Sequence, residues 1–176
     1  SEAIFDGVFQ PGVSGGGTGG FGGSTYQAGA LRGDIYFLPN GTRALPDFNQ
    51  MQPVGSIYTH SLNVPNQSFT KGFPGVTDRF EWFGIRYTGG FQVYQGGEYQ
   101  FRCVSDDGSK VWIDGQLIIN NDGVHPARGV SGKIYLTPGH HSIQVDYFQG
   151  PRTMVCLGLY MTPPGGTEQL FQVAQP

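Results

Sequence analysis

The sequence has few charged residues, and they form no long run of either sign. Charged side chains make up 13% of the 176 residues, and 10 Lys and Arg stand against 13 Asp and Glu, a net charge of −3. Proteins that bind nucleic acid neutralise its phosphates with clustered basic side chains. Because the sequence contains no such cluster, we expect no nucleic-acid partner.

Long apolar runs are lacking as well. A helix that crosses a bilayer needs a predominantly apolar stretch of about 18 residues or more, and the sequence contains none. The first residues show no signal-peptide pattern. We therefore expect no membrane insertion, and a mature domain excised from a larger protein would look the same.

Cysteine is scarce. Cys103 and Cys156 each lie in an apolar run, where a disulfide across neighbouring strands and two free thiols are equally compatible with the sequence. Neither cysteine has the C-x-x-C spacing of a zinc site. We therefore predict that His60, His140 and His141 are surface or turn residues and not metal ligands.

Glycine and proline, by contrast, are abundant, with 30 and 12 residues. This content approaches that of disordered chains, but 14% aromatic and 38% hydrophobic residues are enough to form a core. The length suits one domain, residues 1–176. Within it, residues 1–11 are predicted to supply an edge strand. Residues 12–30 are predicted to form a Gly-rich surface loop that buries little.

Short segments with alternating apolar residues dominate the rest of the chain, and no segment keeps a helical period. Such strands, separated by turn residues, indicate an all-β fold, an antiparallel β-sandwich that is jelly-roll-like with long loops. Residues 45–75 are predicted to be long connections, because Pro, Asn and Gly are frequent there. The predicted strands are residues 34–38, 79–87, 91–94, 99–104, 110–113, 117–119, 132–136, 141–148 and 153–161.

The adjacent carboxylates Asp106 and Asp107 mark the centre of the chain. They lie between two of the predicted strands, residues 99–104 and 110–113. The next turn, Asp114-Gly115, is a strong hairpin signal because Gly accepts a positive φ. The Asp pair is therefore expected at the rim of a sheet. There it could bond local backbone N–H groups as ordinary turn chemistry, or it could hold a cation.

Two linked runs resemble the protective-antigen-type domain family (PA-fourteen). They are SDDGSKVWIDGQLIINNDGVH at residues 105–125 and SGKIYLTPGHHSIQVDYFQG at residues 131–150. The family is a β-sandwich found in toxin components, yeast flocculins, epithelial adhesins, glycosidases and bacterial adhesins. In its lectin members two consecutive Asp residues, joined by a cis peptide bond, bind one Ca²⁺. The resemblance, strong over residues 73–161, implies these roles for Asp106 and Asp107.

The chemistry of Ca²⁺ adds a second loop to this expectation. The ion takes six to eight oxygen ligands, roughly, from carboxylates, amide and backbone carbonyls and water. Two carboxylates neutralise it but cannot fill its shell. The segment that ends the predicted strand 141–148 offers the missing oxygens, because Gln149 carries a side-chain carbonyl and Gly150 a free backbone carbonyl. We predict that Gln149 and Gly150 complete the metal site.

The resemblance implies a calcium-dependent carbohydrate-binding module, or lectin, of a larger extracellular adhesin, monomeric as an isolated domain. Its partners would be cell-surface or extracellular glycans, bound through vicinal hydroxyls of a hexose. The alternative is a structural or protein-interaction module without sugar binding. The predicted carbohydrate-binding residues are Asp106, Asp107, Gln149, Arg152, His125 and Asn121.

Catalysis is not expected. Paired carboxylates of glycosidases face each other across a cleft, whereas adjacent Asp residues on one turn do not flank a scissile bond. No G-x-S-x-G nucleophile motif occurs either. Trp82 and Trp112 lie in alternating apolar segments, so we predict that both belong to the core and do not form a platform for a sugar.

Overall fold

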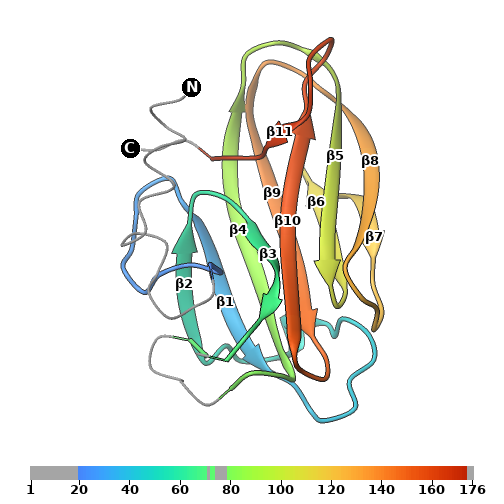
Figure 1. Ribbon diagram of the computed structural model, residues 1–176. Coiled ribbons are helices and arrows are strands. Elements are labelled where there is room, and N and C mark those ends of the chain that lie inside the picture. Colours follow the sequence, from blue (N-terminus) through green and yellow to red (C-terminus); the bar gives the residue numbers. More distant parts are fainter. Residues whose placement is uncertain (1–19, 71, 74–78, 174–176) are drawn as a thin grey trace.

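The computed structural model describes residues 20–70, 72–73 and 79–173 and consists of two antiparallel sheets packed as a sandwich (Figure 1). The predicted fold class is confirmed. The predicted edge strand in residues 1–11 and residues 12–19 of the Gly-rich loop lie outside the described residues. Within the described part of the chain the one helical element is a 3-10 turn, η1 (Phe48–Gln50). No helix found there is long and apolar enough to span a membrane.

Six strands form one sheet and five the other. In the six-stranded sheet the order is β2 (Gly55–Thr59), β1 (Leu31–Phe37), β4 (Phe83–Val93), β9 (Gly139–Gln149), β6 (Ser109–Ile113) and β7 (Gln116–Asn121). In the five-stranded sheet the order is β11 (Gln169–Leu170), β10 (Met154–Thr162), β5 (Gly97–Asp106) and β8 (Arg128–Leu136), and β3 (Asn63–Ser68) also pairs with β10.

Two predictions about the strands need correction. β4 runs unbroken through Gly89 and Gly90, because β9 pairs with it at every residue and supplies hydrogen bonds that the local sequence does not reveal. The predicted connections in residues 45–75 contain β2 and β3, which pair with β1 and β10. Pairing with a distant strand therefore overrides the local turn signals.

The core lies between the two sheets. In β5, Tyr99, Phe101 and Cys103 are buried, and the alternate residues face outward. Phe21, within the predicted Gly-rich loop, is also fully buried and contacts the rings of Phe69 and Phe73 at centroid distances of 5.5 and 6.0 Å. The prediction that residues 12–30 bury little is therefore wrong at Phe21.

Both cysteines are free thiols, which resolves the two alternatives that the sequence leaves open. Cys103 is fully buried in the core, and its Sγ lies 3.4 Å from the Oγ of Ser109. Burial raises the pKa of the Cys103 thiol to about 12. Cys103 therefore behaves as a small apolar side chain at neutral pH.

The Asp114-Gly115 turn joins β6 to β7 as predicted, and both residues have positive φ, 51° and 79°. His141, predicted to be a surface or turn residue, is instead buried behind this turn. Its Nδ1 lies 2.6 Å from Oδ2 of Asp114, and its Nε2 lies 2.7 Å from the carbonyl oxygen of Thr137. Both partners can only accept, so both ring nitrogens donate when the imidazole is protonated.

Close packing between the sheets generates a prediction about Gly132 in β8. A Cβ at this position would overlap the backbone oxygen of Ile118 in β7 of the opposite sheet. Overpacking of this kind costs about 1–3 kcal/mol, so Gly132→Ala should lower the free energy of unfolding by that amount in urea denaturation. Gly55→Ala is the control, because no atom lies within 4 Å of its Cβ. Equal midpoints for the two variants would contradict this packing.

The buried His141 generates a pH prediction. The hydrogen bond with Asp114, and then that to Thr137, raises the pKa of His141 in the folded protein. Its stabilising contribution is therefore complete below about pH 6.5 and is lost as the pH rises through the raised value. His141→Asn should be less stable than the wild type near pH 6, and the difference in urea midpoint should shrink at alkaline pH. Exposed His140→Asn is the control, and a pH-independent difference for His141→Asn would refute the assignment.

Candidate functional site

The turn between β5 and β6 places Asp106 and Asp107 at one end of the sandwich. β5 ends at Asp106, and the peptide bond that joins it to Asp107 is cis, as the resemblance implies. The N–H of Asp107 donates to the carbonyl of Phe148 at 3.2 Å, and the N–H of Phe148 donates to Gly108 O at 3.0 Å. The turn is thus fixed to the end of β9.

Gly108 allows a third segment to approach this turn. A Cβ at Gly108 would lie 2.6 Å from Cε1 of Phe148, 2.7 Å from Oδ1 of Asp122 and 2.8 Å from the nitrogen of Gly123. A side chain would therefore displace the loop between β7 and β8. The glycine after the Asp pair is required by this close approach.

The Asp107 carboxylate joins three segments of the chain. Its Oδ1 accepts a hydrogen bond from the backbone N–H of His125 at 3.1 Å, in the β7–β8 loop. Its Oδ2 accepts one from the backbone N–H of Gly150 at 2.7 Å, in the β9–β10 loop. The side chain is buried, with 4% exposed. Asp107 is therefore a structural as well as a candidate ligand residue.

Asp106 lies beside Asp107 in a partly buried setting. Burial, followed by the charge of Asp107, raises the pKa of the Asp106 carboxyl to about 6. Burial also raises the pKa of Asp107, although hydrogen bonds from Gly150 and His125 act in the opposite direction. The hydroxyl of Tyr147 donates to the Asp106 carbonyl at 2.7 Å and fixes the backbone. Two neighbouring carboxyl groups with raised pKa values fit a bound cation, which favours their charged forms.

Gln149 closes the β9–β10 loop from inside the protein. Its side chain is fully buried, and Nε2 donates to the carbonyl of Met154 at 2.8 Å. Its Oε1 is buried and has no hydrogen-bond partner among the described residues. The carbonyl of Gly150 accepts from the N–H of Trp82 at 3.1 Å, which leaves that oxygen one further lone pair.

The donor set fits a hard cation. Among the described residues, no group of three or more His, Cys, Asp or Glu side chains could hold a metal ion. A cation at the Asp pair would therefore draw its other ligands from amide and backbone oxygens and from water. Ca²⁺ accepts such ligands, whereas structural zinc prefers Cys and His. The unpaired Oε1 of Gln149 belongs to the chemical class that Ca²⁺ requires.

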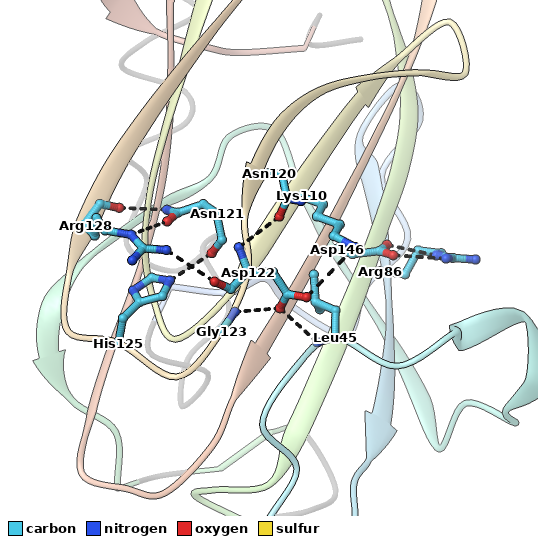
Figure 2. Close-up of polar contacts among 10 residues, drawn as sticks. All are labelled: Leu45, Arg86, Lys110, Asn120, Asn121, Asp122, Gly123, His125, Arg128 and Asp146. Atoms are coloured by element: carbon cyan, nitrogen blue, oxygen red, sulfur yellow. Dashed lines mark hydrogen bonds and ion pairs between the residues drawn. The ribbon is translucent and has the colours of Figure 1, made fainter.

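An open hollow of about 340 Å³ lies over the Asp pair, and Arg152 and His125 are on its walls. Arg152 is 61% exposed, and its Nε is 3.7 Å from Oε2 of Glu81. The ring nitrogens of His125 face two carbonyl oxygens. Nδ1 lies 2.7 Å from that of Pro126, and Nε2 lies 2.8 Å from that of Asn121 (Figure 2). Arg152 therefore remains accessible to a ligand, whereas the polar atoms of His125 support the loop.

The prediction that Asn121 binds carbohydrate is wrong, because its side chain is fully buried beneath the β7–β8 loop. Its Nδ2 donates to the carbonyl of Arg128 at 2.8 Å, and its Oδ1 accepts from Nε of Arg128 at 2.8 Å (Figure 2). Asn121 has no polar atom left for a sugar. Sequence reasoning missed this role of Arg128, because the reciprocal contact depends on the conformation of the loop.

Comparison with known proteins assigns a family to this architecture. The family model described as the PA14 domain matches residues 46–173, well over half of the chain. The solved "PA14 sugar-binding domain from RTX adhesin" has a TM-score of 0.68 at 21% identity, over 86% of this chain and 99% of that one. The epithelial adhesin 9 A domain of Candida glabrata, solved with Galb1-3GlcNAc, has a TM-score of 0.58 at 13% identity, over 81% and 85% of the two chains.

One curated relative is described as an anti-sigma factor, unlike the two adhesin domains above. The chain is 31% identical over 83 residues to the anti-sigma-I factor RsgI3 of Acetivibrio thermocellus. The match covers 47% of this chain and spans only 13% of the length of that protein. The structural similarities show the same fold, and the family model supplies the assignment. The chain therefore belongs to the PA14 domain family.

Proposed function

We propose that this domain is a calcium-dependent carbohydrate-binding module of a larger extracellular protein, such as an adhesin. The observation that carries the proposal is the adjacent pair Asp106 and Asp107, in which the Asp107 carboxylate ties its own turn to the β7–β8 and β9–β10 loops. The buried, unpaired Oε1 of Gln149, at the start of the β9–β10 loop, supports it. The sugar-binding descriptions of two structurally similar domains support it.

Each side chain has a defined task in this proposal. Asp106, Asp107, Gln149 and the carbonyl of Gly150 would hold the ion. Calcium, when bound, supplies open coordination positions to vicinal hydroxyls of a hexose. The two carboxylates would also accept hydrogen bonds from those hydroxyls, and exposed Arg152 would donate to a further sugar oxygen.

The shape of the hollow determines the strength of binding. An open site of about 340 Å³ buries little of a monosaccharide, so affinity for one sugar should be weak. Display of many copies on a parent protein would compensate by effective concentration. Cell-surface or extracellular glycans are the partners that suit such a module, and it would act by adhesion and not by catalysis.

The first test is calcium titration by calorimetry, followed by titration of hexoses with and without EDTA. Asp106→Asn removes one ligand charge while leaving the hydrogen bonds of Asp107 intact, so it should abolish calcium binding without unfolding the protein. For the wild type, free calcium at 100 times Kd should raise the free energy of unfolding by about 2.7 kcal/mol. Sugar heat should disappear in EDTA.

Glu98→Gln is the matched control, because it also removes one carboxylate, which is 65% exposed in β5. It should bind calcium as the wild type does. If the wild type gives no calcium heat at millimolar concentration, the Asp pair is turn chemistry, and the domain is a structural or protein-interaction module. Calcium binding without any sugar response would restrict the ion to a structural role.

The metal-free protein gives a second test at the same residue. Because folding raises the pKa of Asp106 from 3.8 to about 6, the folded state holds that proton more tightly. The stability of the wild type in EDTA should therefore fall as the pH rises from about 4 through about 6. Asp106→Asn should show a smaller decline and equal or greater stability at neutral pH. An unchanged slope in urea denaturation would show that Asp106 is not the titrating group.

A further inference from the structure

A second and larger hollow lies on the outer face of the six-stranded sheet. Its volume is about 660 Å³, within the range of roughly 300–1,000 Å³ that is typical of small-molecule sites. The hollow lies apart from the residues that line the one over the Asp pair, and the proposed calcium site does not use it. Its floor is formed by Arg86, Thr88, Lys110, Trp112, Gln144 and Asp146.

The strand register arranges this floor in two rows. Lys110, Asp146 and Arg86 are cross-strand neighbours on β6, β9 and β4. The next row is formed in the same way by Trp112, Gln144 and Thr88. Since Val111 and Ile113 point into the core, Lys110 and Trp112 occupy the opposite face of β6.

The prediction that Trp112 belongs to the core is therefore wrong. It is half-buried and lines the hollow. Its indole nitrogen donates no hydrogen bond to any residue that the structure describes, so that donor is available. Trp112 brings an aromatic surface and one free donor to a floor that is otherwise polar.

The wall of the hollow is already in place without a ligand. The segment at residues 45–49 forms it. The N–H of Leu45 donates to Oδ1 of Asp122 at 2.9 Å, and Asn49 Oδ1 accepts from a terminal nitrogen of Arg86 at 2.7 Å. Figure 2 shows the contact of Leu45 with Asp122 and that of Arg86 with Asp146. A preformed site of this kind loses little entropy on binding.

The charges in the hollow balance. Arg86 and Lys110 carry two positive charges, and Asp47 and Asp146 carry two negative charges. Arg86 binds Asp146 through two contacts of 2.9 and 3.0 Å, so neither group offers an unpaired charge to a ligand. Lys110 lies 3.9 Å from Asp122. This balance disfavours a polyanionic ligand and suits a neutral one with many hydroxyl groups.

We propose that this hollow is a second, calcium-independent carbohydrate site for a neutral oligosaccharide. The apolar C–H face of one pyranose ring packs against Trp112. Gln144 and Lys110 bond its hydroxyl groups, since an amide both donates and accepts and an ammonium group donates. Thr88 and Asn49 flank the adjoining sugar. The assignment is independent of the proposed calcium site, because no residue of that site lines this hollow.

The test is calorimetry in EDTA with hexamers of the β1,4-glucan, β1,4-xylan, β1,4-mannan and α1,4-glucan series. One of these should bind the wild type. Trp112→Ala should weaken that binding at least about tenfold, which corresponds to roughly 1.4 kcal/mol. Gln144→Ala should weaken it as well, and it serves as the second variant if Trp112→Ala fails to fold by circular dichroism. Tyr135→Ala, which removes an aromatic ring that is 70% exposed on β8, should bind as the wild type does.

Two results would overturn the proposal. One is that no hexamer binds in EDTA at millimolar concentration. The other is that a hexamer binds equally well to the wild type and to folded Trp112→Ala and Gln144→Ala. Because every titration is made without calcium, failure of the calcium proposal would leave this result unaffected. The reverse also holds, since calcium binding at the Asp pair is measured without an oligosaccharide.

Discussion

The hydrogen bonds to the Asp107 carboxylate are the constraint on which the structure around the Asp pair depends. The backbone N–H groups of His125 and Gly150 belong to two loops that are distant in sequence, and both donate to this one side chain. Burial of a carboxylate is unfavourable unless such donors compensate for lost water. The same contacts that offset this cost also define the shape of the hollow.

Asp106 and Asp107 have different environments although they are neighbours. Asp107 is held by two backbone donors, whereas Asp106 combines partial burial with a neighbouring carboxylate, which raises its pKa to about 6. Raised pKa values mean that ionisation of the two carboxyl groups is less favourable in the metal-free protein than in water. A divalent cation would favour their ionised forms.

The sequence predicted what local patterns control and missed what depends on distant partners. The alternation in β5 and the Asp114-Gly115 turn were predictable, because strand period and positive φ are local properties. The burial of Phe21 and Asn121 depends on contacts with remote segments. Trp112 is a different case, since strict alternation with Val111 and Ile113 already places it outside. Its apolar character led to the wrong assignment.

Asp122 shows why the two hollows belong to one structural unit. Its carboxylate accepts from the N–H of Leu45 and so holds the wall of the outer-face hollow. Its carbonyl accepts from a terminal nitrogen of Arg128 at 3.2 Å, and Arg128 in turn fixes Asn121 below the loop that reaches Asp107. A displacement of the β7–β8 loop would therefore alter the surroundings of both hollows. The β7–β8 loop therefore contacts both the turn that carries the Asp pair and the wall of the outer-face hollow.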